Sequence, residues 1–314
     1  MRKSVLLLAS MALALLLAAG VALAAVEVNA VGEEKIIFVS DRTTGTGVDN
    51  PEADFEIFTI NPDGSGLQQI TKNDTDESSP AVSFDGTQVA FMGDGRSGNN
   101  WGIWRMNLDG SAERRLGYGL EPAWSPNDRW ITYHRRFAKQ SDIYKMKAVN
   151  GFDKTNLTNT PEDFELGAAW SPNGLRIAYL RLPPTTQGDI YDMRIDGSQQ
   201  TNLTDTPKFQ EDYIDYSPGG ALIAFTDWNY SEQLYKMRSD GSGEPTLILD
   251  LDPSSFYTPA WSPDGTQIGF GGSPGGRDSG IFKVNADGSG LENVTKSPAF
   301  VGDVMGDWYR VPTG

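Results

Sequence analysis

Two short motifs in this 314-residue chain have the residue types of catalytic or cofactor-binding loops. Residues 271–275 (Gly-Gly-Ser-Pro-Gly) match the nucleophile elbow, in which a serine sits on the turn between a strand and a helix. Pro274 and Gly275 are typical of a turn instead, and the only histidine of the sequence is His134. Residues 93–98 spell the dinucleotide fingerprint, yet no predicted helix follows to face a pyrophosphate. Both motifs therefore predict loops.

Metal and cofactor chemistry has few candidate ligands in this sequence. A single histidine weakens the hypothesis of a metal-dependent lyase or lactonase. The Asp-Gly pairs lack the spaced oxygen ligands of a calcium loop, and their regular recurrence marks them as turns. We therefore predict no catalytic residue, no metal and no cofactor. Ca²⁺ bound by acidic loops is the alternative that stays open.

Arginines and aromatic residues form a set with binding chemistry. Each lies at the end of the second strand of a predicted four-stranded repeat, or beside a loop on the same side. Because neighbouring strands run in opposite directions, these positions all lie on one face. An arginine there can grip a carboxylate-bearing peptide or sugar, or it can pair with neighbouring acidic loops. An exposed aromatic residue can anchor a protein partner, or it can pack its own loop. The predicted binding residues are Arg42, Arg96, Trp101, Arg135, Arg136, Arg181, Trp228, Tyr230 and Arg277.

The elements that must position these residues are the strands of a repeat. Trp124, Trp170, Tyr216, Trp261 and Trp308 each end a predicted strand and recur every 45 to 47 residues. Ser-Pro-Asp-Gly or a variant follows most of them, because proline presets φ and glycine supplies positive φ. An Ile-Ala-Phe strand comes next, then an Asp-Ile-Tyr-x-Met strand, an Asp-Gly hairpin and a fourth strand. This pattern predicts a six-bladed β-propeller of four-stranded blades.

The two ends of the repeat are incomplete in complementary ways. Residues 36–42 form a second strand with no first strand before it, and residues 303–308 form a first strand with no second strand after it. We predict that the C-terminal strand pairs with the N-terminal strands and closes the propeller, which removes an open sheet edge. Asn156, Asn202 and Asn293 fit the glycosylation pattern, but their equivalent places in the repeat favour a structural role.

The first residues differ in composition from the repeat. Arg2 and Lys3 precede an apolar run, and small residues follow it, which predicts a signal peptide over residues 1–24; a retained membrane anchor is the alternative. Residues 25–34 are a predicted linker, and residues 35–314 are the predicted propeller. Without Arg2 and Lys3 the charge is 24 − 42 = −18, which disfavours nucleic acid and anionic lipid. We expect a monomer without membrane insertion after signal cleavage.

The repeated combination of the Ser-Pro-Asp-Gly turn, the Ile-Ala-Phe strand and the Asp-Ile-Tyr-x-Met strand before Asp-Gly resembles the TolB family of WD-like propeller repeats. The resemblance covers residues 36–312 and implies a six-bladed propeller, in the periplasm or outside the cell, that binds other proteins. TolB proper carries an additional α/β domain before its propeller, for which residues 25–34 leave no room. The Tol–Pal envelope role of the family is therefore not carried over.

The sequence thus predicts an exported, non-catalytic propeller that binds another protein at the cell envelope or outside the cell. Its irregular loops gather on one face, so the binding surface is expected there. One alternative is a propeller polysaccharide lyase or glycan hydrolase that uses channel carboxylates. Paired acids in a deep pocket, one with a raised pKa, would favour that alternative. Another is a structural module that packs against a surface layer or an envelope complex.

Overall fold

The computed structural model of the protein describes residues 32–94, 101–184, 186–205, 211–227, 233–250, 256–273, 279–298 and 301–312. These residues contain 24 β-strands and no helix, which confirms the predicted all-β class. A membrane-crossing helix is accordingly not found in this part of the chain. The strands belong to a compact unit from Glu34 to Pro312. The predicted signal peptide falls outside the described residues.

Twenty of the strands form groups of four that follow the chain order. The first group is β4 (Glu77–Val82), β5 (Gln88–Gly93), β6 (Gly102–Asn107) and β7 (Arg114–Tyr118). The second is β8 (Leu120–Trp124), β9 (Trp130–Arg136), β10 (Ser141–Lys147) and β11 (Thr155–Asn156). The third is β12 (Phe164–Trp170), β13 (Arg176–Leu182), β14 (Asp189–Arg194) and β15 (Thr201–Asn202). The fourth is β16 (Glu211–Tyr216), β17 (Leu222–Asp227), β18 (Gln233–Arg238) and β19 (Thr246–Asp250). The fifth is β20 (Phe256–Trp261), β21 (Gln267–Gly272), β22 (Gly280–Asn285) and β23 (Glu292–Asn293).

The sixth group takes its strands from both ends of the compact unit. β24 (Asp303–Arg310) comes first, followed by β1 (Glu34–Ser40), β2 (Glu56–Ile60) and β3 (Gln68–Gln69). β24 pairs with β1 in antiparallel register from Glu34↔Arg310 to Ser40↔Asp303. The predicted pairing of the C-terminal strand with the N-terminal strands is therefore present in the structure.

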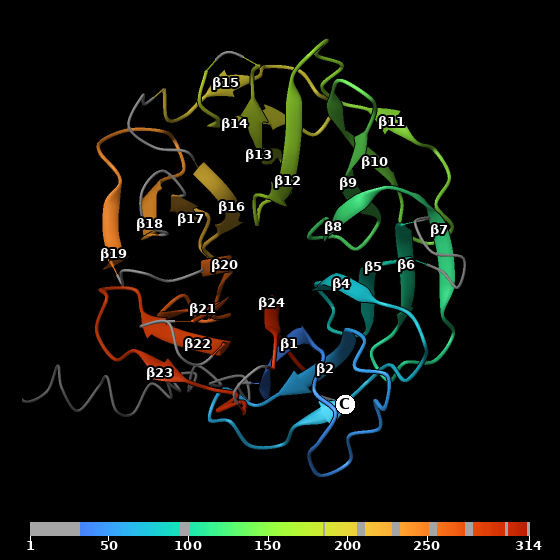
Figure 1. Cartoon of the computed structure of the whole chain (residues 1–314). Coiled ribbons are helices and arrows are strands. Elements are labelled where there is room, and N and C mark those ends of the chain that lie inside the picture. The colour runs from blue at the N-terminus through green and yellow to red at the C-terminus, as the bar shows by residue number, and fades with distance from the viewer. Residues whose placement is uncertain are drawn as a thin grey trace, which may run out of the picture. The chain divides into compact units, whose positions relative to one another are not determined.

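Within the compact unit the groups lie around a common centre, and the first strand of each group is innermost (Figure 1). β24 contacts both β20 and β4, and the remaining first strands contact one another in chain order. The second and third groups also meet at one parallel residue pair, Ser141↔Phe164, which joins them into an eight-stranded sheet. All first strands therefore face one central region.

The hydrophobic core lies between neighbouring groups. One cluster joins Leu234 and Ile248 of the fourth group to Trp261 and Phe270 of the fifth. Inside a group, the aromatic residues of the second and third strands stack, as Phe270 and Phe282 do with ring centroids 5.9 Å apart. The aromatic residue in each strand motif is thus one half of a cross-strand pair.

The Ser-Pro-Asp-Gly turn is held by its own side chains. The Ser262 hydroxyl donates to Asp264 Oδ1 at 2.6 Å and accepts from the Gln267 amide at 2.9 Å. Asp264 also accepts from the Thr266 amide at 2.9 Å, and Gly265 has a φ of 72°. The motif therefore fixes a tight reversal, with glycine where φ is positive.

The strand ends define two faces of the compact unit. The tight-turn face carries the turns from first to second strands and the hairpins from third to fourth strands, which are linked by bonds such as Ala148 N to Arg129 O at 3.0 Å. The loop face carries the other connections, including the segment after β9. Because Glu34 pairs with Arg310 at the end of β24, the chain enters β1 on the tight-turn face.

Candidate functional site

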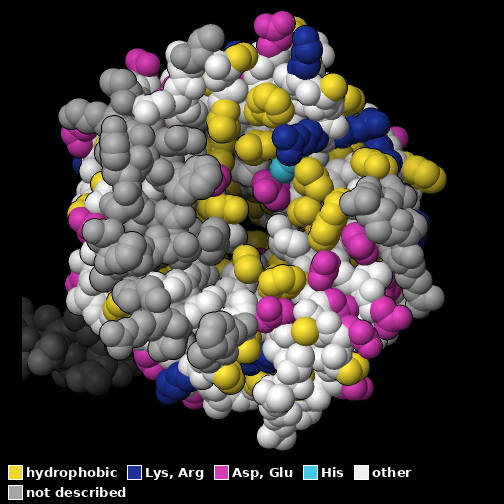
Figure 2. All heavy atoms as spheres, viewed as in Figure 1, with side chains coloured by type: hydrophobic (Ala, Val, Ile, Leu, Met, Phe, Trp, Pro, Cys, Tyr) yellow, Lys and Arg dark blue, Asp and Glu magenta, His cyan; other side chains and the backbone are white. Residues whose placement is uncertain are grey.

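The first strands enclose a cavity of about 660 Å³ at their common centre. Its wall includes the repeated aromatic residues, which are Trp124, Trp170, Tyr216, Trp261 and Trp308. Figure 2 shows hydrophobic side chains around a central hollow, with acidic side chains, basic side chains and a histidine at its edge. The cavity is therefore apolar in its wall and charged at its rim, as ligand pockets commonly are.

The wall is shaped by a kink that recurs in the first strands. Ser79, Glu121, Tyr213 and Thr258 have φ values between 41° and 50°, and Gly167 at the corresponding place has 55°. Each lies where the pairing of its strand with the next strand shifts register. A left-handed conformation costs non-glycine residues on the order of 1–3 kcal/mol and concentrates at functional sites. The kinks turn these residues into the cavity lining.

Two aspartates lie in the cavity wall. Asp215 Oδ2 accepts from the Trp261 amide at 2.8 Å, and Asp307 Oδ2 accepts from the Val82 amide at 3.0 Å. Burial raises the pKa of Asp215 to about 8, and the charge of Asp307 adds to that effect. Burial also raises the pKa of Asp307 to about 6. Each aspartate thus links its own group to the next, and the two form a pair of acids with one strongly raised pKa.

A histidine–glutamate contact lies in the second group, where this group meets the third. His134 Nδ1 is 3.3 Å from Glu121 Oε2, which also accepts from the Gly167 amide at 3.1 Å. Burial acts to raise the pKa of Glu121, but the contact with His134 and the hydrogen bond from the Gly167 amide outweigh it, so the pKa is lowered. Neither residue is among the binding residues predicted from the sequence. Its signal was available, since His134 ends a second strand opposite the start of β8.

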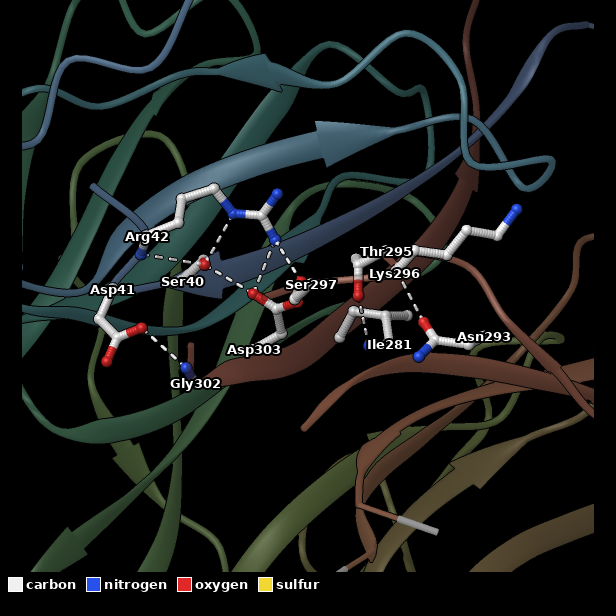
Figure 3. Close-up of polar contacts among 10 residues, drawn as sticks. All are labelled: Ser40, Asp41, Arg42, Ile281, Asn293, Thr295, Lys296, Ser297, Gly302 and Asp303. Carbon is white, nitrogen blue, oxygen red and sulfur yellow. Dashed lines mark hydrogen bonds and ion pairs between the residues drawn. The ribbon is translucent and has the colours of Figure 1, made fainter. Parts of the chain in front are cut away.

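Arg42 and Arg181, two of the predicted binding residues, make contacts inside the protein. Arg42 is buried, and its Nη2 lies 2.7 Å from Asp303 Oδ1 while its Nε donates to Ser40 Oγ at 2.9 Å (Figure 3). Its guanidinium also covers the ring of Phe38 at 5.1 Å. Arg181 is half-buried and pairs with Asp163 at 2.7 Å. Both side chains therefore stabilise the fold through ion pairs.

Arg135 and Arg136 are exposed at the loop-face end of β9. The Arg135 guanidinium lies 5.4 Å from the Phe137 ring centroid, and that of Arg136 lies 5.9 Å from Phe164. Among the described residues, neither arginine has an acidic partner within ion-pair distance. Asp142, the register partner of Arg135, instead accepts hydrogen bonds from Gln140, Asn156 and Thr160. The two arginines thus keep their charge available at the surface.

The other predicted binding residues are placed as follows. Trp101 is half-buried just before β6, beside the loop face. The remaining four lie outside the described residues; they are Arg96, Trp228, Tyr230 and Arg277. Within the described part of the chain, no cluster of three or more His, Cys, Asp or Glu side chains is placed to hold a metal ion.

The repeated Asn-Leu-Thr segment forms a link between groups. Asn156 Nδ2 donates to Asp142 at 3.1 Å, and its Oδ1 accepts from the Thr158 amide at 3.2 Å. The Thr158 hydroxyl accepts from Ile143 N at 3.1 Å and donates to Glu165 at 3.3 Å. Burial raises the pKa of Glu165 to about 7. These contacts give the Asn-Leu-Thr segment a structural role, which its equivalent places in the repeat had favoured.

The all-β groups around a central cavity define a propeller-like protein, and comparison with known proteins gives its family. The family model of the TolB beta propeller domain matches residues 118–297, which is more than half of the chain. The chain therefore belongs to this family. A TolB homolog of Chlorobium luteolum is 33% identical over 115 residues, which cover 36% of the chain and 24% of that protein. The chain thus spans about a quarter of the length of this relative.

Solved structures share the fold. TolB from Acinetobacter baumannii aligns with a TM-score of 0.70 and 17% identity over 87% of the chain and 66% of that protein. The putative TolB from Agrobacterium tumefaciens has a TM-score of 0.66 and 18% identity over 89% and 99%. Oligogalacturonate lyase from Vibrio parahaemolyticus has a TM-score of 0.53 and 16% identity over 85% and 74%. At these identities the likeness concerns the fold alone.

Proposed function

We propose that this protein is an exported six-bladed TolB-like propeller that binds another protein at the cell envelope or outside the cell, without catalysis. Each four-stranded group is one blade, and the pairing of β24 with β1 closes the ring. The predicted signal peptide at 1–24 and linker at 25–34 support export to the periplasm or beyond. Membership of the TolB propeller family supports a role in protein binding.

The binding surface is the loop face at the rim of the cavity. The observation that carries this proposal is the exposure of Arg135 and Arg136 over aromatic rings, without acidic partners among the described residues. A guanidinium held against a ring is ordered before a partner arrives, and it can take a carboxylate in a bidentate pair. The partner therefore presents an acidic segment, with Trp101, Arg96, Trp228, Tyr230 and Arg277 as further contacts.

A pull-down from envelope extract tests this surface. The exported protein serves as bait beside its Arg135→Ala/Arg136→Ala variant. Loss of two central contacts is expected to cut the captured partner by about tenfold or more. Arg238→Ala is the matched control, because Arg238 is exposed at the end of β18 on the tight-turn face. Equal capture by the wild type and the double variant would place the partner elsewhere.

The lyase or hydrolase hypothesis is supported by one observation, the acid pair of Asp215 and Asp307 with its raised pKa. Against it, both aspartates accept main-chain hydrogen bonds from the next group, which a structural role explains. Incubation with uronate-containing oligosaccharides decides between them. Cleavage that is abolished in Asp215→Asn would support the enzyme, and intact oligosaccharide supports the binding protein.

A further inference from the structure

Acidic residues are concentrated in one stretch of the chain. Residues 49–77, which run from the connection between β1 and β2 to the start of β4, contain 8 Asp or Glu and 1 Lys. In Figure 2 acidic side chains gather at the lower right, over the sector where Figure 1 labels β2 and β4. Acidic side chains are ordinary where water surrounds them. In this stretch, however, several of their oxygens are buried.

Four buried oxygens within residues 50–56 accept no hydrogen bond. They are both carboxylate oxygens of Asp54, Oε2 of Glu56 and the amide oxygen of Asn50. Glu56 is 0% exposed and Asn50 is 3% exposed. Buried polar atoms are nearly always hydrogen-bonded, and buried charges are paired with other charges or coordinate metals. The four oxygens therefore have the environment of ligands to a cation.

Local contacts bring these three side chains together. Asn50 Nδ2 donates to the main-chain oxygen of Asp54 at 2.7 Å, which places the amide oxygen beside Asp54. Burial raises the pKa of Asp54 to about 6, and the charge of Glu56 adds to that effect, so the two carboxylates are neighbours. The Phe55 amide between them donates to Asp76 Oδ1 at 2.9 Å. The connection from β1 is thus fixed against the segment before β4.

The chain supplies a cation to another buried acid, but not to this pair. Asp303 has Arg42 at 2.7 Å. Among the described residues, no Lys or Arg lies within ion-pair distance of Asp54 or Glu56. Glu56 Oε1 instead accepts from the Asn73 amide at 2.6 Å, which is a neutral donor. The two carboxylates therefore carry a charge that a cation from solution can balance, as Arg42 does for Asp303.

The chemistry of the ligands selects the cation. All four atoms are hard oxygen donors, which favour Ca²⁺ or Mg²⁺ over transition metals, and two carboxylates balance a divalent charge. Mg²⁺ keeps several of its waters, whereas Ca²⁺ takes protein oxygens from flexible loops. Because the four oxygens are buried, the set favours Ca²⁺. It contains two acidic side chains and one amide, and so differs from the clusters of three or more that the described residues lack.

We propose that Asn50, Asp54 and Glu56 bind one Ca²⁺ ion on the loop face. Main-chain oxygens and water supply its remaining ligands. The ion neutralises the two buried carboxylates and holds the connection between β1 and β2 against the start of β2. These residues give a definite place to the calcium alternative that the sequence left open. The site is separate from Arg135 and Arg136, so its failure would leave the proposed function standing.

Calorimetric titration with CaCl₂ tests the site in the exported protein, after chelator treatment and dialysis. The wild type is expected to bind Ca²⁺ and to bind Mg²⁺ at least about tenfold more weakly. In Asp54→Asn the affinity for Ca²⁺ is expected to fall about tenfold or more, because a charged ligand becomes neutral. Glu52→Gln is the matched control, since Glu52 is exposed in the same connection. It removes the same charge and is expected to bind Ca²⁺ as the wild type does.

Thermal unfolding of the same proteins separates metal binding from a structural role. Ca²⁺ at about 100 times its Kd is expected to raise the Tm of the wild type and of Glu52→Gln by about 5 °C. Asp54→Asn and Glu56→Gln are expected to lose this response. Without Ca²⁺, Asp54→Asn is expected to unfold at the same or a higher temperature than the wild type, because an unbalanced buried charge is gone.

Several outcomes would overturn the proposal. They are no binding of CaCl₂ by the wild type, equal binding of Ca²⁺ and Mg²⁺, and unchanged Ca²⁺ binding in both Asp54→Asn and Glu56→Gln. An equal loss of affinity in Glu52→Gln would show a general effect of charge and would also overturn it. Stabilisation by a tetra-arginine peptide, without a response to CaCl₂, would assign the two carboxylates to a cationic partner instead.

Discussion

Arginines at the loop-face ends of two second strands have opposite environments. Arg42 follows β1 and is buried against Asp303, Ser40 and the ring of Phe38. Arg135 and Arg136 end β9 and are exposed. The difference lies in the available acids, because Asp303 of β24 reaches Arg42, whereas Asp142 beside Arg135 is occupied by neutral donors. An arginine at the loop-face end of a second strand therefore stabilises the fold in one group and stays available for binding in another.

The largest loss of unfolding free energy is expected for Arg42→Ala. Removing the guanidinium leaves Asp303 buried without its cation, which costs about 3–5 kcal/mol of unfolding free energy. Denaturant unfolding measures this loss. Arg181→Ala is the control, since the half-buried Arg181–Asp163 pair should contribute about 1 kcal/mol or less. A loss below that of the control would show that the Arg42 network does not hold the chain ends together.

Stability is expected to fall as pH rises from about 5 to 9. The pKa values of Asp215, Glu165 and Asp307 are raised in the folded state to about 8, 7 and 6. The folded state thus binds more protons than the unfolded state over this range, so the slope is negative. Because Asp215 and Asp307 are partly accessible in the cavity wall, the total is on the order of 2–3 kcal/mol. Asp215→Asn should flatten the curve, and a rising curve in the wild type would contradict the assignment.

The aspartates of the Asp-Gly hairpins have the opposite effect on stability, and this effect appears at low pH. Hydrogen bonds from the Ser198 hydroxyl and amide lower the pKa of Asp196, and Ser289 does the same for Asp287. Groups with a lowered folded pKa stabilise the fold at neutral pH and lose this effect as pH falls through that pKa. The unfolding free energy is therefore expected to pass through a maximum at about pH 4, near the carboxyl pKa values of the unfolded chain.

A smaller loss is expected for Thr158→Ala. The hydroxyl accepts from Ile143 N and donates to Glu165, so its removal should cost about 1 kcal/mol. Thr155→Ala is the matched control, because Thr155 is exposed and its hydroxyl has only a 3.4 Å contact to Asp153 O. Chemical unfolding of the two variants compares them directly. Equal losses would show that the Asn-Leu-Thr link carries no special stability.

The smallest stability change is expected for Arg135→Ala/Arg136→Ala. Both side chains are exposed and lack acidic partners among the described residues, so the change should stay within about 0.5 kcal/mol. Thermal unfolding will measure it beside Arg42→Ala. A large loss would mean that the β9 end is a structural contact, as the Arg42 region is.

The repeat made the strands predictable, while individual partners were not. Spacing of Trp and Ser-Pro-Asp-Gly is a local signal, and it gave the strand order and the pairing of β24 with β1. Arg42 and Asp303 are 261 residues apart, and no local pattern reveals that they meet. The alternating direction of the strands could assign the arginines to one face. It could not distinguish the arginines that form ion pairs from those without an acidic partner among the described residues.

Some site residues could have been found by comparing the repeats. The residue before the repeated aromatic is Ala123, Ala169 or Ala260 in three groups, but Asp215 and Asp307 in two others. An aspartate where the other groups have alanine thus predicts an acidic side chain in the cavity wall from the sequence alone. The kinked residues of the first strands are different, since Ser79, Glu121, Tyr213 and Thr258 share no residue type that predicts positive φ.

Crosslinking in the cell tests the loop-face proposal most directly. A photoreactive amino acid replaces Phe137, which is 40% exposed against Arg135, and in a parallel strain it replaces Phe84, which is 73% exposed on the tight-turn face. The proposed binding surface predicts one discrete protein adduct from position 137, lost in Arg135→Ala/Arg136→Ala and absent from position 84. No protein adduct from position 137, or the same adduct from both positions, would contradict it.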